Sequence, residues 1–398
     1  RRIHNKGEFK MAVKVNCLNP IAACGMELLP DTYEITDNYA DADAVLVRSA
    51  SMHDLELSDK LLCVARAGAG VNNIPLDKCA DKGIVVFNTP GANANGVKEL
   101  FVTGMLLAAR DVVGGINWAK ENADNENISK DMEKAKKQFA GTELMGKKIG
   151  VIGLGAIGVL VANVANRMKM DVYGVDPFLS VNNALSLSRD VKIVKSYEEI
   201  YKNCDYITIH VPLLEDTKGM LNKEAFDQMK DGVVILNMAR DTLVNDDDMK
   251  AALESGKVAK YVTDFPNPAV MKMPNVIATP HLGASTAESE DNCAVMAVDE
   301  IRNYMENGNI INSVNYPNCD AGVCDTKGRI TVCHKNVPAM LNRITNVFSE
   351  ANINIAHMTN KSRGDYAYCV FDIDSESSKE VADKLSAIDG VLKVRVVK

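Results

Sequence analysis

Apolar residues recur along the chain in two spacings, which predict alternating strands and helices. Short apolar runs at 12–17, 44–48, 61–67 and 84–88 are separated by helical or turn segments, which is the pattern of a small parallel α/β unit. A long helix is predicted from about residue 95 to 118, and an amphipathic helix from 127 to 139.

A second α/β unit is predicted from about residue 141 to 279. Its first strand, 148–152, leads into a glycine turn and a helix with apolar residues at helical spacing. A helix from about 286 to 305 leads back toward the first unit, so we expect the second unit to be inserted into the first. The further strands predicted for the second unit are 172–176, 206–210, 233–237, 260–264 and 276–278.

The C-terminal part follows a polar stretch with little periodicity and has the order strand, helix, strand, strand, helix, strand. That order is typical of the ferredoxin-like βαββαβ arrangement. We therefore predict an α/β protein with two doubly wound parallel-sheet domains and a third, ferredoxin-like domain. The predicted boundaries are 11–95 with 287–315 for the first domain, 96–286 for the second, 316–327 for a linker and 328–398 for the third.

Composition and charge argue against several kinds of partner. The formal net charge of −8 argues against nucleic acid or an anionic membrane as a main partner. No apolar run approaches the roughly 20 residues that span a bilayer, and the start of the sequence does not read as a signal peptide. The ten cysteines form no C-x-x-C pair, so we expect free thiols, no metal site and a cytoplasmic protein.

A glycine motif at 153–158 predicts a dinucleotide site. Gly153 permits a sharp turn, Gly155 lets a pyrophosphate approach the backbone, and Gly158 lets helix and strand pack closely. The helix N-terminus offers its amide hydrogens to the phosphates. Asp176 ends the next strand, where a carboxylate binds the ribose hydroxyls of NAD and repels the 2′-phosphate of NADP. A glycine-rich turn in another doubly wound fold is the alternative.

Two strand ends of the second unit carry side chains suited to the oxidation of a hydroxy acid. This reaction needs a base for the hydroxyl proton and a cation for the carboxylate. Arg240 follows strand 233–237 and can present a guanidinium fork, although a surface arginine at a strand end would look the same. His281 lies between the last strand and a turn of small residues, and it is our predicted base.

Several motifs together resemble the D-2-hydroxyacid dehydrogenase family. They are residues 153–158, 210–213, 237–240 and 280–286. The resemblance covers about residues 12 to 398 in the right order, and it implies a substrate-binding domain, a Rossmann NAD domain and an ACT regulatory domain within the boundaries above. Residues 68–74, 88–93 and the C-terminal βαββαβ unit are similar to the phosphoglycerate-oxidising branch of the family.

The resemblance implies a reaction and the residues that serve it. The reaction is NAD-dependent oxidation of 3-phosphoglycerate to 3-phosphohydroxypyruvate, the first step of L-serine biosynthesis, in a homodimer or homotetramer. His281 is then the acid/base and Arg240 the carboxylate anchor. Arg48 would bind the phosphate, unless it is an ordinary solvated arginine at a strand end. The residues implied for the substrate are Arg48, Ala69, Gly70, Val71, Asn93 and Arg240. The residues implied for the cofactor are Gly153, Gly155, Ala156, Ile157, Gly158, Asp176, His210, Val211, Pro212, Ala239, Arg240, Asp264, His281 and Gly283.

The sequence departs from the family at two positions. The family normally has a glutamate five positions after the aspartate that matches Asp264, where this chain has Ala269, and a glycine after the arginine, where it has Asp241. Losing the glutamate removes the carboxylate that would stabilise a protonated imidazole. We hypothesise that another side chain takes over this role. Lys98 is one candidate, with a lysine on the helix surface as the alternative.

The C-terminal unit contains residues that match an effector site. His334, Asn336 and Asn354 match the positions that bind serine in serine-sensitive members of the family, while Ala339 stands where the family usually has glycine. We predict that serine binds across a dimer of ACT units and lowers activity.

Two other functions remain open on this sequence. One is an NAD-dependent dehydrogenase of an unphosphorylated 2-hydroxy acid such as glycerate or lactate. The other is an NADH-sensing binding protein with low turnover, which the missing glutamate favours.

Overall fold

The computed structural model describes residues 12–398, so Met11, where the first domain was predicted to begin, lies outside the described residues. Contacts between residues divide the chain into two compact units. The first comprises the chain up to Ala92 together with Glu290–Lys398, and the second is Asn93–Ser289. The second unit is therefore inserted into the first, as predicted, and the C-terminal part predicted as a third domain is grouped with the first unit.

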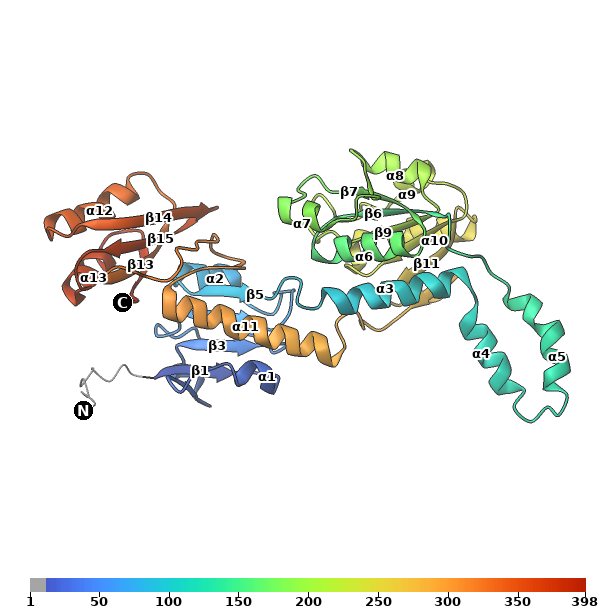
Figure 1. Cartoon of the computed structure of the whole chain (residues 1–398), viewed down its shortest axis with the longest axis horizontal. Coiled ribbons are helices and arrows are strands. Elements are labelled where there is room, and N and C mark those ends of the chain that lie inside the picture. The colour runs from blue at the N-terminus through green and yellow to red at the C-terminus, as the bar shows by residue number, and fades with distance from the viewer. Residues whose placement is uncertain (1–11) are drawn as a thin grey trace. The chain divides into compact units, whose positions relative to one another are not determined.

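The first unit contains a five-stranded parallel sheet in the order β2-β1-β3-β4-β5. All four residues of β3 are buried, as expected for a parallel strand covered on both faces. Helix α11 (Ala287–Asn307) lies along the sheet (Figure 1), and its Ala297, Val298 and Ile301 belong to the core. The other elements are β1 (Val13–Cys17), α1 (Ala23–Met26), β2 (Tyr33–Ile35), β3 (Ala44–Val47), β4 (Cys63–Arg66), α2 (Leu76–Asp81) and β5 (Val85–Asn88).

The second unit contains a seven-stranded parallel sheet in the order β12-β11-β10-β9-β6-β7-β8. Its first six strands in chain order are arranged 3-2-1-4-5-6, which is the Rossmann order. The strands are β6 (Lys148–Ile152), β7 (Asp171–Val175), β8 (Lys192–Ile193), β9 (Tyr206–Ile209), β10 (Val233–Asn237), β11 (Val258–Thr263) and β12 (Val276–Ala278). The helices that follow β6 are α6 (Ala156–Arg167), α7 (Val181–Ser186), α8 (Tyr197–Asn203), α9 (Lys223–Gln228) and α10 (Asp246–Glu254).

The prediction of a single long helix over 95–118 is wrong, because the structure has two helices there. Helix α3 (Ala94–Ala109) ends at Arg110, which has extended backbone angles, and Asp111 then caps α4 (Val112–Glu121) by accepting from the Gly114 amide. Helix α5 (Ile128–Ala135) follows, and α4 and α5 form a helical hairpin (Figure 1). Aspartate favours the start of a helix over its interior, because its side chain accepts from the amides of the first turn.

The last part of the first unit is a four-stranded antiparallel sheet in the order β14-β15-β13-β16. The order of its elements is βαββαβ, as predicted. Its own core includes Phe348, Phe371 and Leu385. The elements are β13 (Gly328–Lys335), α12 (Met340–Glu350), β14 (Ile355–Arg363), β15 (Tyr366–Ile373), α13 (Lys379–Ser386) and β16 (Val391–Val396).

This antiparallel sheet packs against the five-stranded sheet within the first unit. Tyr368 and Val370 of β15 belong to the same core cluster as β1, β3 and α11. The guanidinium of Arg395 lies 4.3 Å from the centre of the Tyr304 ring and donates to the backbone carbonyls of Tyr304 and Met305 at the end of α11. The C-terminal sheet is therefore fixed to the five-stranded sheet by buried contacts.

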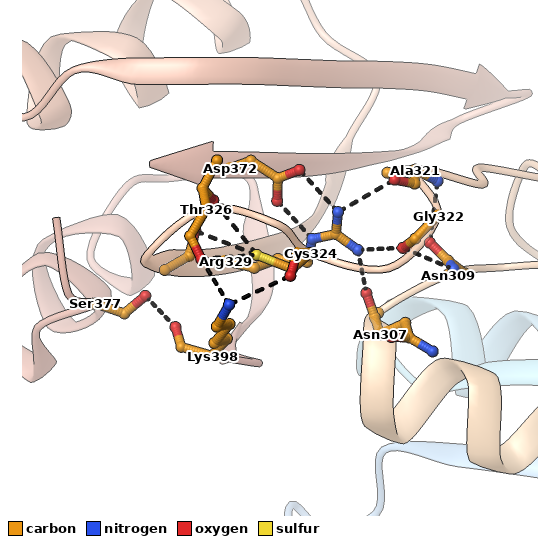
Figure 2. A network of polar contacts seen from close by, with 12 residues as sticks. Asn307, Asn309, Ala321, Gly322, Cys324, Thr326, Arg329, Asp372, Ser377 and Lys398 are labelled. Carbon is orange, nitrogen blue, oxygen red and sulfur yellow. Dashed lines mark hydrogen bonds and ion pairs between the residues drawn. The ribbon is translucent and has the colours of Figure 1, made fainter. Parts of the chain in front are cut away.

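A fully buried arginine strengthens this attachment (Figure 2). Arg329 forms a bidentate pair with Asp372, with 2.7 Å between Nη2 and Oδ2. Its remaining donors bind the carbonyls of Asn307, Ala321 and Gly322. Because all the oxygens around it come from elements of the first unit, the guanidinium joins β13 to the end of α11 and to the segment that follows it.

The segment 316–327, predicted as a linker, contributes side chains to the core. Tyr316 and Cys319 are fully buried. The Tyr316 hydroxyl donates to the carbonyl of Ala80 at 2.7 Å, and Cys319 pairs with Ile310 as an isolated bridge. The segment thus connects the two sheets of the first unit while packed against both α11 and α2.

Three features bear on the expectations from composition. All ten cysteines are free. Within residues 12–398 no group of three or more acidic, cysteine or histidine side chains is placed to hold a metal ion. In the same described part of the chain, no helix is both long and apolar enough to cross a bilayer.

Candidate active site

The glycine turn of the second unit has the geometry of a phosphate-binding loop. Gly153 has φ of +91°, and a Cβ there would lie 2.6 Å from the carbonyl oxygen of His210. A Cβ at Gly158 would lie 1.9 Å from the Gly153 oxygen, so both positions require glycine. Gly155 has open space around it and precedes α6, whose first residues are Ala156 and Ile157. A phosphate can therefore approach the backbone at this helix N-terminus.

Asp176 follows β7 and is held beside the glycine turn. Its Oδ2 accepts from the Leu154 amide at 2.9 Å, and its Oδ1 accepts from the Phe178 amide at 2.8 Å. Each carboxylate oxygen retains a lone pair for a further donor. This arrangement suits a carboxylate that receives hydrogen bonds from ribose hydroxyls.

His210 lies at the end of β9, with Val211 and Pro212 following it, and its ring faces the protein interior. Nε2 lies 2.9 Å from the Thr208 hydroxyl, and Phe101 packs edge-on with 6.2 Å between ring centres. Nδ1 is buried and has no hydrogen-bond partner in the described residues. Burial lowers the pKa of His210 to about 4, so the imidazole is neutral at pH 7.

A buried amide shapes the turn that carries Arg240. Asn237 is fully buried at the end of β10. Its Oδ1 accepts from the amides of Ala239 and Arg240, at 3.1 and 3.3 Å, and its Nδ2 donates to the Arg240 carbonyl at 2.7 Å. The Arg240 side chain is exposed, and Nη1 donates to the Ala239 carbonyl. Asp241 begins a short 3-10 helix, η3 (Asp241–Leu243), and is not among the described residues with positive φ.

A buried carboxylate shapes the turn that carries His281 in the same way. Asp264 follows β11 and is 1% exposed. Its oxygens accept from the Thr279 hydroxyl at 2.6 Å and from the amides of Leu282 and Gly283 at 2.7 and 2.8 Å. The His281 amide donates to the Asp264 carbonyl at 2.9 Å. Asp264 therefore fixes the backbone on both sides of the histidine.

His281 has an unusual backbone conformation. Its φ is +57°, a left-handed value that costs a non-glycine residue roughly 1–2 kcal/mol. Such strain is concentrated at functional sites. The exposed imidazole lies against Phe265, with 5.0 Å between ring centres. Ala269 has only a methyl group to offer where the family has a glutamate, and its amide donates to Asn267.

The position of Lys98 leaves its predicted role open. The ammonium donates to the Asn95 side chain at 2.5 Å and lies 3.8 Å from a Glu99 oxygen, so its recorded partners are on its own helix, α3. The side chain is only 22% exposed. Asn93 precedes the same helix and does not cap it with its side chain.

In the first unit, Arg48 has a carboxylate partner and an arginine neighbour. Its Nη2 lies 2.7 Å from Oε1 of Glu290, with both side chains about half exposed. Arg66 ends the adjacent strand β4, and its Nε donates to the Arg48 carbonyl at 2.9 Å while Nη1 donates to the carbonyl of Gly70. Arg66 was missed from the sequence, although it too is an arginine at the end of a strand in this unit.

The backbone of 68–71 has amide groups suited to an anion. Asn88 donates to the Ala69 carbonyl at 2.6 Å, and Gly68 has φ of +153°. In residues 12–398 the amides of Gly70 and Val71 donate to no acceptor. Successive free amides of this kind bind carboxylate or phosphate oxygens.

The three predicted effector residues do not converge within one chain. His334 is buried, with Nδ1 near the carbonyl of Lys335, and Asn336 donates to the Gly364 carbonyl at 3.0 Å. Asn354 lies at the other end of the sheet and donates to Asp374. His334 pairs with Ala367 of β15, whereas Ile355 pairs with Ile373. Six residues of strand separate them, which is about 20 Å.

Ala339 lies after β13, at the end of the sheet where His334 and Asn336 lie. It precedes α12 with φ of +64°, a conformation that glycine adopts without strain. The alanine therefore fits the family's turn at some conformational cost.

Comparisons with known proteins agree with this geometry. Residues 102–283 match the family D-isomer specific 2-hydroxyacid dehydrogenase, NAD binding domain, and residues 328–390 match the ACT domain. A D-3-phosphoglycerate dehydrogenase of Haemophilus influenzae is 33% identical over 354 residues, with 86% of this chain and 83% of the relative covered. The D-3-phosphoglycerate dehydrogenase of Homo sapiens is 36% identical over 282 residues, which are 68% of this chain and 50% of the relative. The chain thus spans about half the length of that relative.

The structure is also similar to solved structures of dehydrogenases. The NAD+-bound 3-phosphoglycerate dehydrogenase of Entamoeba histolytica is 26% identical with a TM-score of 0.59, and 76% of this chain and 99% of that chain are covered. A D-2-hydroxyisocaproate dehydrogenase is 21% identical with a TM-score of 0.61, over 76% of this chain and 99% of that one, and it bears on the fold alone. Because the Haemophilus relative matches over most of both chains and the second unit matches the NAD-binding domain, this chain belongs to the D-isomer specific 2-hydroxyacid dehydrogenase family.

Proposed function

We propose that this protein oxidises 3-phosphoglycerate to 3-phosphohydroxypyruvate with NAD as the acceptor, as the names of its relatives indicate for them. The observation that carries the proposal is the pair of buried anchors, Asn237 and Asp264. They hold the turn with Arg240 after β10 and the turn with His281 after β12, at the same edge of an NAD-binding parallel sheet. A protein that only binds NADH has no need of a positioned guanidinium and imidazole there.

The residues present suit the dinucleotide. Gly155 leaves open space before α6 where a Cβ would approach a pyrophosphate, and Asp176 lies where the adenosine ribose hydroxyls can donate to it. When bound, NAD accepts a hydride from C2 of the hydroxy acid. The remaining cofactor residues of the proposal lie in the same loops: Val211 and Pro212 after β9, Ala239 after β10, and Gly283 after β12.

The protein groups handle the proton and the carboxylate. His281 takes the hydroxyl proton as the hydride leaves C2, so that the alcohol becomes a ketone and the imidazole becomes cationic. Arg240 binds the carboxylate through its guanidinium fork, which orients C2. In the first unit, the free amides of Gly70 and Val71 are proposed to bind the carboxylate. Arg48, assisted by Arg66, is proposed to bind the phosphate.

A spectrophotometric comparison tests this function. Purified protein is mixed with NAD and 3-phosphoglycerate, and NADH absorbance is followed beside parallel samples that contain D-lactate or D-glycerate. The proposal expects NADH from 3-phosphoglycerate well in excess of the other two. Faster turnover of an unphosphorylated acid would indicate a different substrate, and NADH binding without turnover of any acid would indicate a binding protein.

Regulation, assembly and location are proposed on separate grounds. Serine is proposed to bind between ACT units of two chains, since His334 and Asn336 lie at one end of the sheet and Asn354 at the other.

A homo-oligomer is supported by the α4–α5 hairpin, which exposes Val113, Ile116 and Met132. The ten free cysteines support a cytoplasmic location. Serine at millimolar concentration should lower the rate and shift the melting temperature, and no change in either would make the ACT unit purely structural.

A further inference from the structure

A cavity of about 510 Å³ lies in the first unit, and none of its lining residues is one proposed for catalysis. One face of α11, from Asn292 to Asn303, lines it together with residues that include Ala92 and Ile311. The lining is partly apolar and contains three asparagines and two carboxylates, those of Asp299 and Glu300. Cavities of this volume hold small organic molecules, with a few polar groups that fix their orientation.

Glu300 is a buried carboxylate that the protein satisfies on one oxygen only. The residue is 7% exposed, and Oε1 accepts from the Asn312 amide group at 2.9 Å. Oε2 is buried and has no hydrogen-bond partner in residues 12–398. An unpaired buried carboxylate oxygen is costly, so a donor that reached Oε2 would be bound favourably.

The cavity favours a positive ligand over a negative one. None of the lining residues is basic, and Arg302, the cation of α11, is already paired with Asp299 at 4.0 Å and with Glu306 at 3.2 Å. A phosphate or a carboxylate in the cavity would therefore meet two acidic groups and no lining cation. The amide of Asn309 donates to the Asn303 side chain and to the Gly322 carbonyl, and Figure 2 shows the contact with Gly322. Its donors are therefore already used within the protein.

We propose that this cavity binds a small organic ammonium ion with a short apolar chain. The nitrogen donates to Glu300 Oε2 and to Asp299, and the chain packs against Val295, Met296 and Ile311. A zwitterionic amino acid is excluded because its carboxylate has no cation to meet. None of the residues that line the site belongs to the proposed hydride-transfer residues.

Proton release provides a signature of this binding mode. Burial raises the pKa of the Glu300 carboxyl to about 8, with the Asn312 hydrogen bond opposing the rise and Asp299 adding to it. At pH 7 the empty site therefore holds a proton, which must leave when an ammonium ion binds. Titration calorimetry in two buffers of different ionisation enthalpy counts the protons released.

The test uses the full chain and n-butylamine as the probe. We expect n-butylamine to raise the melting temperature and to release close to one proton per molecule bound at pH 7, while n-butanol and 4-aminobutanoate give no shift. Glu300→Gln keeps an oxygen for Asn312 and should bind n-butylamine at least tenfold more weakly. Glu306→Gln changes an exposed glutamate of the same helix and should bind like the unaltered protein.

Two results would overturn the proposal. One is the absence of any n-butylamine binding to the unaltered protein. The other is equal binding to Glu300→Gln and the unaltered protein, which would assign the binding to the apolar wall alone. Near-ultraviolet circular dichroism of each variant establishes that the compared proteins are folded.

Discussion

The backbone amide of Asp264 donates to the carbonyl of Asn237 across 3.2 Å. Asn237 ends β10 and Asp264 directly follows the neighbouring strand β11, and both side chains are buried. Asn237 holds the turn of Arg240, and Asp264 holds the turn of His281. The two proposed functional groups are therefore positioned by one pair of linked, buried polar residues.

Replacing Asn237 by alanine should disturb Arg240 more than it disturbs the nucleotide site. The variant loses three hydrogen bonds to residues 239 and 240, so the guanidinium is no longer held in place. We expect KM for 3-phosphoglycerate to rise by about tenfold or more, as 1.4 kcal/mol of lost binding gives tenfold. KM for NAD should rise less, because the glycine turn and Asp176 keep their contacts. Asn222→Ala removes another turn-forming asparagine, the cap of α9, and should lower stability alone. Equal increases in both KM values would contradict the account.

Replacing Asp264 by asparagine should impair catalysis more than folding. The carboxylate accepts three hydrogen bonds, whereas an amide has only one accepting oxygen, so the His281 turn loosens. We expect kcat to fall by about tenfold to a hundredfold. Asp205→Asn is the matched control, because Asp205 also binds a backbone amide, that of Lys148, at the start of β6. If both variants lost activity equally, general destabilisation would explain the result.

Replacing Lys98 by methionine tests whether it compensates for the missing glutamate. The substitution keeps the helix and most of the side-chain volume. If Lys98 transfers or orients a proton, kcat falls by about a hundredfold or more, with the Kd for NADH unchanged. Unaltered turnover would remove Lys98 from the mechanism and leave it as a residue paired with Asn95 and Glu99.

His210 makes stability depend on pH in the acid range. Its pKa is about 4 in the folded protein, below the ordinary 6.5, so between those values the unfolded chain binds a proton that the folded protein does not. The free energy of unfolding should therefore fall as pH drops from about 6.5 to 4, by up to about 1.4 kcal/mol per pH unit from this residue. Urea unfolding of His210→Asn should show a shallower decline over that window. An equally steep decline would mean that the imidazole does not stay neutral.

The sequence predicted the strands and the glycine turn well because their signals are local. Apolar runs marked β6, β9 and β10 within a residue or two, and Gly153 and Gly158 serve the close contacts expected of them. The break between α3 and α4 was missed, because Asp111 caps a new helix in a stretch whose apolar spacing continues past it.

The anchors of the site were harder to predict than its functional groups. Arg240 and His281 were recognised from the chemistry they could perform, whereas the structural role of Asn237 depends on which atoms its amide meets in the folded turn. Asp264 was assigned to the cofactor, and its bonds to 279–283 appear only in three dimensions. Arg329 was not singled out at all, since nothing in its sequence neighbourhood indicates five surrounding oxygens.

The turnover of His281→Asn tests the central claim most directly. Asparagine tolerates the left-handed backbone at this position better than most residues do, so the turn and the NADH site should persist while the base is lost. We predict that NADH formation from 3-phosphoglycerate falls by about a hundredfold to ten-thousandfold, with the Kd for NADH within about threefold of the unaltered protein (~0.7 kcal/mol). Turnover close to that of the unaltered protein would contradict the assignment of His281 as the base.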